Sequence, residues 1–212
     1  MQLYSYWRSS SSYRVRIALE LKGIAYSLRP VHLVRDGGEQ RQQAYTAMNP
    51  QGYVPLLVDG DLQLTQSLAI IDYLDSVQPD PLLVPPSQPQ RGRVLAFAQT
   101  VASDIQPLQN LSVLQHLTTA LGHPAEMRAQ WSAYWIGKGL SVLEQMLSHQ
   151  SGDYCFGDTP TLADVVLIPQ MYNAERFGLS MEDYPRLARV TRHCRDLPAF
   201  QRAHPDAQPD AE

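Results

Sequence analysis

The chain has 212 residues, a net charge of −4, and 44% hydrophobic and 18% charged residues, a composition typical of a globular protein. The small negative charge argues against a general nucleic-acid-binding surface. Two distant cysteines, Cys155 and Cys194, give neither a disulfide framework nor a metal-ligand spacing, so we predict reduced thiols and no metal site. The sequence shows no signal-peptide pattern and no apolar run long enough to span a bilayer, so a cytoplasmic protein is expected.

The first part of the chain begins with a strand–helix–strand pattern. Residues 3–6 predict a strand, an amphipathic helix follows and ends at Gly23, and residues 26–31 predict a second strand. A unit of this length places the two strands parallel. Pro30 lacks an N–H group, so the second strand is expected at a sheet edge.

A hairpin and another helix complete this part. Residues 39–48 predict a short helix, and residues 54–64 predict two strands joined by a tight turn at Asp59-Gly60. The next helix is expected to begin at Gln66-Ser67. The order of elements predicts an α/β domain with a mixed four-stranded sheet.

A change in composition predicts a domain boundary. Five prolines lie within residues 79–89, which we interpret as a linker between a domain at 1–78 and a second domain at 90–212. Strand patterns nearly vanish after it, so the second domain is predicted to be all-α. The polar tail from Pro205 is expected to be disordered.

Two features organise the predicted helical domain. Residues 91–121 have helical spacing, and Pro107 should break or kink that helix. Thr161 and Asp164 form a capping box at the start of a helix that is apolar on all sides and therefore buried.

Four consecutive serines, residues 9–12, stand between the first strand and the first helix. A helix start offers unpaired N–H groups and a partial positive charge, and Ser11 or Ser12 can cap it. Such a place can hold an anion or favour the ionised form of a thiol. A loop with a plain helix cap explains the local sequence equally well.

Four separated blocks of the chain resemble the zeta class of glutathione transferases. They are Arg8-Ser9-Ser10-Ser11-Ser12 with residues 14–19, and residues 66–71, 105–111 and 173–177. The resemblance covers nearly the whole chain and implies a thioredoxin-like α/β N-terminal domain, an all-α C-terminal domain and a homodimer. One position departs from the class, because its members usually carry a cysteine where this chain has Ser11.

The resemblance implies glutathione as the cofactor. Ser9 is expected to be the main hydroxyl donor to the glutathione thiolate, with Ser10 and Ser11 supporting it. The other residues implied to bind glutathione or to line the neighbouring substrate site are Gln40, Val54, Pro55, Gln66, Ser67, Asp104, Gln106, Asn110, Leu111 and Ser112.

The expected roles of these residues differ. Val54-Pro55 resembles a cis-proline turn whose backbone pairs with a tripeptide, although a trans-proline at a strand start is the simpler alternative. Gln66-Ser67 would bind the γ-glutamyl carboxylate at a helix start. A serine that only caps the helix is an alternative with the same geometry. Gln40 would reach the glycyl end. Polar residues around Pro107 would contribute to the glutathione and substrate sites. Alternatively, they lie on the solvent-exposed face of a kinked core helix.

Two arginines are implied to bind the substrate. Arg8 directly precedes the serines, and Arg176 follows the apolar helix. A guanidinium group binds a carboxylate bidentately, which suits a dicarboxylate-like substrate with two acidic ends. Arg14 and Arg16 are interpreted as ordinary surface charges.

The implied activity is glutathione-dependent cis–trans isomerisation of maleylacetoacetate to fumarylacetoacetate in tyrosine and phenylalanine catabolism. Maleylpyruvate, from gentisate catabolism, shares the maleyl head and remains an alternative substrate. A general transferase acting on haloacids and other electrophiles, or a non-enzymatic glutathione-binding module, would share the same thiol site.

Overall fold

The computed structural model describes residues 1–212 and divides into two compact units. Unit 1 comprises Met1–Leu83 with Asp196–Glu212, and unit 2 comprises Val84–Arg195. The predicted domain limits stay a prediction, but the contacts group residues 196–212 with the N-terminal unit. No helix has the length and apolar character needed to cross a membrane.

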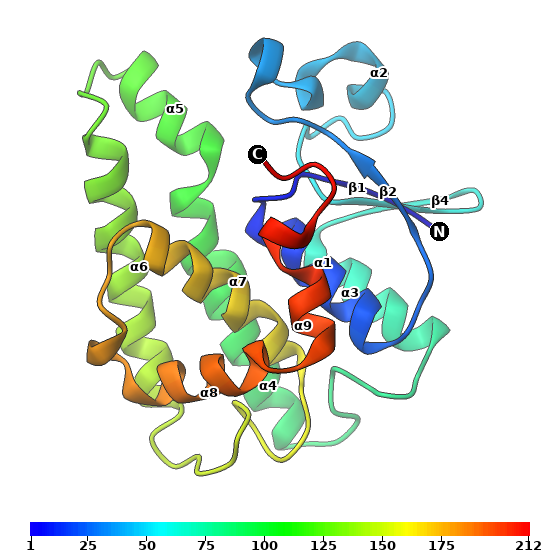
Figure 1. The fold of residues 1–212 in the computed structure, drawn as a ribbon, viewed down its shortest axis with the longest axis vertical. Coiled ribbons are helices and arrows are strands. Elements are labelled where there is room, and N and C mark those ends of the chain that lie inside the picture. The colour runs from blue at the N-terminus through cyan, green and yellow to red at the C-terminus, as the bar shows by residue number, and fades with distance from the viewer. The chain divides into compact units, whose positions relative to one another are not determined.

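Unit 1 is built on a mixed four-stranded sheet in the order β2-β1-β3-β4 (Figure 1). Strand β1 (Gln2–Ser5) pairs in parallel with β2 (Ser27–Pro30) and antiparallel with β3 (Leu56–Asp59). Strand β3 forms an antiparallel hairpin with β4 (Leu62–Thr65). The parallel pair, the edge position of β2 and the hairpin were all predicted, and the structure confirms them.

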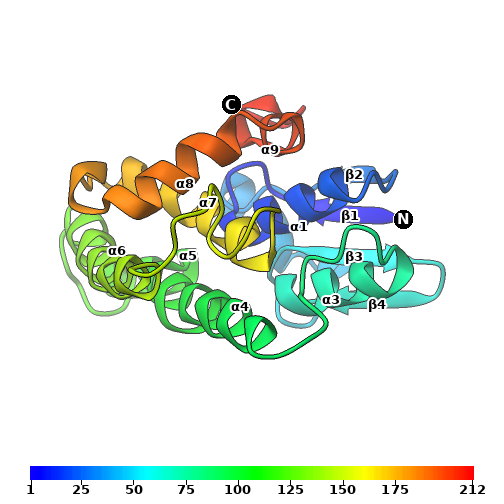
Figure 2. The same ribbon diagram turned by 90° about the horizontal axis from the view of Figure 1, so that it is seen from below.

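Unit 1 has four α-helices, of which three pack together beside the sheet while the short α2 (Gln43–Thr46) lies apart from them (Figure 1). The other three are α1 (Ser10–Leu21), α3 (Ser67–Val77) and the C-terminal α9 (Pro198–Ala203). Helix α1 lies against both α3 and α9 (Figure 2). The core between these elements is fully buried and includes Leu3, Val15, Ile17, Leu57, Ile70 and Leu74.

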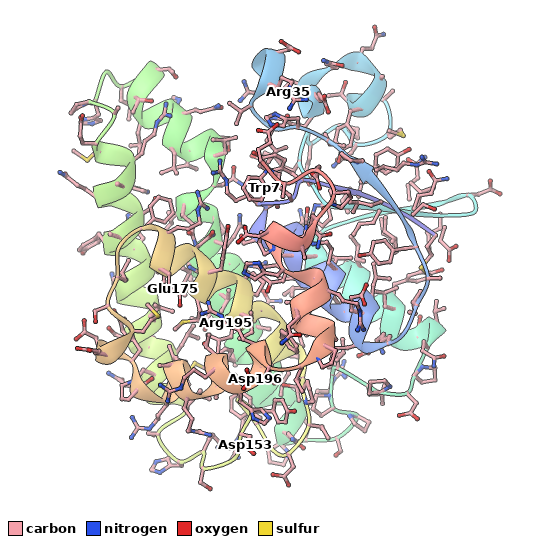
Figure 3. The ribbon with its side chains drawn as sticks, viewed as in Figure 1. Trp7, Arg35, Asp153, Glu175, Arg195 and Asp196 are labelled. Carbon is pink, nitrogen blue, oxygen red and sulfur yellow. The ribbon has the colours of Figure 1, made fainter.

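The C-terminal residues are ordered, so the expected disorder from Pro205 is wrong. The backbone N–H of Trp7 donates to Oδ2 of Asp210 at 3.0 Å, and Glu212 pairs with His32 and Arg35. Figure 3 shows Trp7 beside this segment. The polar composition of the tail gave no sign of these contacts, because they join residues about two hundred positions apart.

Replacing Asp210 by alanine is expected to lower the free energy of unfolding by about 1–2 kcal/mol, because the Trp7 N–H loses its acceptor. Denaturant titration of the purified variant measures this loss. Asp210→Asn keeps an acceptor oxygen and should lose less. Equal stability of the alanine variant and the wild type would show that the contact does not hold the tail.

Unit 2 contains only helices, as predicted for the second half of the chain. They are α4 (Gln90–Gln99), α5 (Leu111–Thr119), α6 (Met127–Met146), α7 (Leu162–Arg176) and α8 (Pro185–Arg195), joined by turns. The predicted break at Pro107 is confirmed. Helix α4 passes into a π-helical turn (Thr100–Ile105) and a 3-10 turn (Gln106–Gln109), and α5 begins after it.

Helix α7 is buried along most of its length, and its predicted capping box is present. Oδ2 of Asp164 accepts from the backbone N–H of Thr161 at 2.8 Å, and Oδ1 accepts from the N–H of Cys155 at 2.8 Å. The capping carboxylate therefore fixes both the start of α7 and the loop before it.

Candidate functional site

Helix α1 begins at Ser10, and the residue before it caps it. The Ser9 Oγ accepts from the backbone N–H of Ser12 at 3.3 Å, so the expected cap at Ser11 or Ser12 is wrong. The helix starts earlier because the chain already turns at Tyr6, whose carbonyl accepts from the Ser9 N–H at 3.0 Å. Since the Ser9 hydroxyl accepts in this cap, its proton remains available for donation to an anion.

The first turn of α1 adds backbone donors to this hydroxyl. The N–H groups of Ser10 and Ser11 lie in the first turn, where no carbonyl of the helix can accept them. The helix dipole adds a partial positive charge at the same point. Ser9 and Ser11 are half-buried, which weakens competition from water. The arrangement can hold a thiolate, and this role of the three serines stays a prediction.

The turn before Ser9 is fixed by Arg16, which is fully buried rather than a surface charge as we expected. Its guanidinium donates to Ser5 Oγ at 3.1 Å, to the Trp7 carbonyl at 2.8 Å and to the Ala203 carbonyl at 3.0 Å. A weaker bond reaches the Tyr6 carbonyl at 3.4 Å. Arg16 therefore ties the end of β1, the turn before α1 and the end of α9 together.

Arg14 is also buried, with 1% of its surface exposed, so its interpretation as a surface charge is wrong as well. Its Nη1 donates to Ser67 Oγ at 3.2 Å, while Nε and Nη2 have no hydrogen-bond partner. Burial lowers the Arg14 pKa to about 10. Unpaired buried donors beside Ser67 suit an anion, and no sequence pattern indicated these donors.

The start of α3 offers further donors beside Arg14. Ser67 is the first residue of α3 and is buried, and no side chain caps the helix. The preceding Gln66 has a φ of +68°, a conformation that costs a residue other than glycine free energy and is often found at functional sites. Its side chain donates to Oε1 of Gln51 at 3.1 Å. Helix start, Ser67 hydroxyl and Arg14 together suit a carboxylate.

The Val54–Pro55 peptide bond is cis, as the family resemblance implied. The bond lies just before β3, at the end of a braced loop. The Asn49 side chain and the Tyr45 hydroxyl both donate to the Tyr53 carbonyl, at 2.7 and 2.6 Å. Burial raises the Tyr45 pKa to about 12, so this hydroxyl keeps its proton. Two side-chain donors therefore hold the carbonyl that directly precedes the Val54–Pro55 turn.

An apolar cluster joins this turn to the residues before the serines. Val54 is buried in it together with Tyr6 and Trp7. The guanidinium carbon of Arg8 lies 5.1 Å from the centre of the Trp7 ring, and Arg8 is half-buried. The cis-proline turn and Arg8 are thus fixed through one cluster in unit 1.

Gln40 is buried and offers one free atom. Its Nε2 donates to the Leu33 carbonyl at 3.2 Å, whereas Oε1 has no partner. Because the amide must present its NH2 group to that carbonyl, the free atom is an acceptor. Gln40 therefore suits an N–H group of the tripeptide better than its glycyl carboxylate.

The predicted site residues of unit 2 follow the break at Pro107. Asp104 is exposed in the π-helical turn, and Gln106 is half-buried. Asn110 caps α5, because its Oδ1 accepts from the backbone N–H of Ser112 at 2.9 Å and from the Ser112 hydroxyl at 2.8 Å. Leu111 is the first residue of α5. A binding role for these five residues stays a prediction.

Arg176 is the last residue of α7 and is exposed. Its Nη1 donates to Oδ1 of Asn173, one turn earlier, at 3.2 Å. The Tyr172 and Phe177 rings lie 5.8 and 5.7 Å from its guanidinium carbon. Asn173 and the two rings therefore hold the Arg176 guanidinium group. The role of Arg176 in substrate binding stays a prediction.

The protein's own thiols are unsuited to nucleophilic chemistry. Cys155 and Cys194 are free and buried, and burial raises the pKa of both thiols above the ordinary value. Only the thiolate form is a strong nucleophile, so both thiols stay unreactive near neutral pH. A reactive thiol at the serine stretch must therefore come from a ligand.

Replacing Arg14 by methionine is expected to weaken glutathione binding about tenfold, because a charged donor beside the carboxylate site is lost. The stability of the ligand-free protein should stay equal or rise, since an unpaired buried charge is removed. Isothermal titration calorimetry and denaturant titration measure the two effects. Arg93→Met, which removes an exposed charge in unit 2, is the matched control; equal effects of both variants on binding would contradict the assignment.

Two family models match the chain: the glutathione S-transferase N-terminal domain at residues 3–82 and the C-terminal domain at residues 124–193. The chain therefore belongs to the glutathione S-transferase family, which confirms the family and the fold class expected from the sequence. A curated relative, the probable maleylacetoacetate isomerase of Vibrio cholerae, is 50% identical over 209 residues, which cover 99% of this chain and 97% of the relative.

Two solved structures are similar over the full length of the chain. The holo structure of maleyl pyruvate isomerase, described as a bacterial glutathione S-transferase in the zeta class, has a TM-score of 0.96 and 42% identity, covering 100% of both chains. A maleylacetoacetate isomerase from Methylobacterium extorquens AM1, with bound malonate and GSH, has a TM-score of 0.95 and 40% identity, again covering 100% of both chains.

Proposed function

We propose that the protein is a glutathione-dependent isomerase that converts maleylacetoacetate to fumarylacetoacetate. The observation that carries the proposal is the pair of anion sites in unit 1, namely the start of α1 with the Ser9 hydroxyl and the start of α3 with Ser67 and Arg14. The similarity to isomerases of maleylacetoacetate and maleylpyruvate supports it. Glutathione, when bound, supplies a thiolate that adds reversibly to the maleyl double bond and permits its rotation.

The residues of unit 1 would hold the tripeptide at both ends and favour the ionised thiol. The Ser9 hydroxyl donates to the sulfur, with Ser10 and Ser11 adding N–H groups of the helix start. A thiol with an ordinary pKa near 8.5 needs about 2.7 kcal/mol of extra stabilisation of its anion to lower the pKa by about two units. The stabilisation of an anion by one charge-assisted hydrogen bond, added to that by a helix start, is of this order.

The other end of the tripeptide would lie at α3. Ser67 and Arg14 donate to the γ-glutamyl carboxylate, and the backbone of Gln66 turns the chain into that helix start. Gln40 accepts from an N–H group, and the backbone of Val54, ahead of Pro55, pairs with the peptide. Asp104, Gln106, Asn110, Leu111 and Ser112 are proposed as further contacts from unit 2.

Arg8 and Arg176 would bind the acidic substrate. Each guanidinium group can donate two hydrogen bonds to one carboxylate. The same positive charges stabilise the negative charge that develops on the conjugated carbonyl when the double bond is attacked. No side chain has to act as a general base once the thiol is ionised.

Turnover of three substrates by the purified protein with glutathione tests this function. Isomerisation of maleylacetoacetate is expected, and the ratio of kcat/KM for maleylacetoacetate and maleylpyruvate identifies the better substrate. A chlorinated acid tests the alternative of general conjugation. Conjugation without isomerisation of either maleyl compound would reject the proposal, and no turnover of any substrate would favour a binding module.

A homodimer is also proposed, on the family resemblance alone, and a cytoplasmic location is proposed because both cysteines are free thiols. Sedimentation equilibrium of the purified protein measures the mass in solution. A mass of twice the chain's 23.8 kDa is expected, and a mass of one chain at micromolar concentration would contradict it.

A further inference from the structure

A chain of three buried amides leads to Arg176 within unit 2. Gln170 and Asn173 precede Arg176 on α7 at steps of three residues, so they share one face of the helix. Gln109 comes from the 3-10 turn after Pro107. All three amide side chains are buried.

The hydrogen bonds of this amide chain run in one direction. Arg176 donates to Oδ1 of Asn173 at 3.2 Å, and Nδ2 of Asn173 donates to Oε1 of Gln109 at 3.3 Å. Nε2 of Gln109 then donates to Oε1 of Gln170 at 2.6 Å. The chain ends there, because Nε2 of Gln170 is buried and has no partner.

Arg176 sets this direction. A guanidinium group can only donate, so Asn173 must present its oxygen to it, and each following amide must then be oriented in the same sense. Reversing all three amides would let Gln170 donate to Gln109, but it would turn the Asn173 NH2 group against Arg176. The reversed chain would also leave a buried Gln170 atom unpaired, its carbonyl oxygen in place of its NH2 group. The bond to Arg176 therefore sets the orientation of all three amides.

The Asn173 side chain that accepts from Arg176 is neutral, and the neighbouring carboxylate of Glu175 has a partner of its own. Glu175 is held by Arg195 of α8 in a bidentate pair, with distances of 2.9 and 2.7 Å (Figure 3). The contact with Asn173 therefore orients the guanidinium without cancelling its positive charge.

We infer that Asn173, Gln109 and Gln170 are positioning residues that orient Arg176 for binding a carboxylate of a dicarboxylic acid. The inference rests on the substrate role proposed for Arg176. The influence of each amide should decrease with its distance along the chain, so Asn173 matters most and Gln170 least.

A double-mutant cycle tests the inference by calorimetric titration with malonate, in the presence of saturating S-methylglutathione. Asn173→Leu is expected to weaken malonate binding about tenfold, the loss of one hydrogen bond to a charged group. In an Arg176→Ala background the same substitution should change malonate binding by less than about twofold. Val165→Ala, a buried change elsewhere in α7, is the control for lost stability and should leave malonate binding unchanged.

Gln109→Met tests the same inference and is expected to weaken malonate binding by about threefold. It replaces Asn173→Leu in the cycle if the Asn173 variant does not fold. Equal weakening with and without Arg176, or no weakening at all, would overturn the inference while leaving the proposed function intact. A wild-type protein that binds no malonate would overturn it together with the role of Arg176. Isomerase turnover, measured separately, decides the proposed function.

Discussion

Replacing Ser9 by alanine is expected to lower kcat/KM with glutathione and a maleyl acid about hundredfold. The substitution removes the hydroxyl proton that would stabilise the thiolate, and removal of one preorganised donor to a reacting anion typically has an effect of about this size. Steady-state kinetics at neutral pH measure the loss. The affinity for glutathione itself should change less, because the carboxylate site at Ser67 is untouched.

The cap function of Ser9 has to be separated from this effect. Ser9→Ala also removes the helix cap, which should cost about 1 kcal/mol of unfolding free energy. Ser180→Ala removes a hydroxyl that caps a turn in unit 2, where Oγ accepts from the N–H of Glu182 at 3.3 Å. A comparable loss of kcat/KM in both variants would assign the effect to stability and contradict the role of Ser9.

Replacing Arg16 by methionine is expected to lower the free energy of unfolding by about 3–5 kcal/mol, because several buried hydrogen bonds to a charged group are lost at once. This is a large part of the total for a typical domain. The variant leaves the carbonyls of Tyr6, Trp7 and Ala203 buried without this donor. Denaturant titration measures the loss, provided that the slope of the transition is unchanged.

Arg29→Met is the matched control for Arg16→Met. Arg29 is exposed on β2 and donates to the Gln2 side chain, so its loss should cost well under 1 kcal/mol. Unfolding of both variants at the same denaturant concentration would contradict the structural role of Arg16. At temperatures where the Arg16 variant stays folded, its activity should still fall, because the turn before Ser9 loses its support.

The sheet and helices of unit 1 were predictable because each rests on a local pattern. Pro30 lacks an N–H donor, and its strand lies at the sheet edge. The Asp59-Gly60 turn joins two strands, and most of the apolar residues that predicted the first helix are buried in α1. The all-α character of unit 2 and the capping box at Thr161 were predictable for the same reason.

Contacts between distant residues were not predictable from such patterns. Asp210 accepts from Trp7 across two hundred positions, and no property of the polar tail indicated it. Arg14 and Arg16 carry charge, and charged residues are usually exposed. Their position between the apolar residues Tyr13, Val15 and Ile17 could have indicated burial. All three neighbours are buried, so this part of α1 has no solvent-exposed face.

The predicted residues of the candidate site come from a family pattern. The structure adds the side chains that contact these residues in space. The sequence located the start of α3 at Ser67 but not the Arg14 donors beside it. It located Arg176 but not the amide chain behind it, because hydrogen-bond direction depends on which side chains meet in space.

The pKa of the glutathione thiol on the protein tests the central claim most directly. The ultraviolet absorbance of the thiolate, recorded for the protein–glutathione complex over a pH series, gives this value. We expect a pKa about two units below the ordinary thiol value of about 8.5, and a return toward 8.5 in Ser9→Ala. A thiol pKa that stays near 8.5 in the wild-type complex would contradict the claim that the start of α1 activates glutathione.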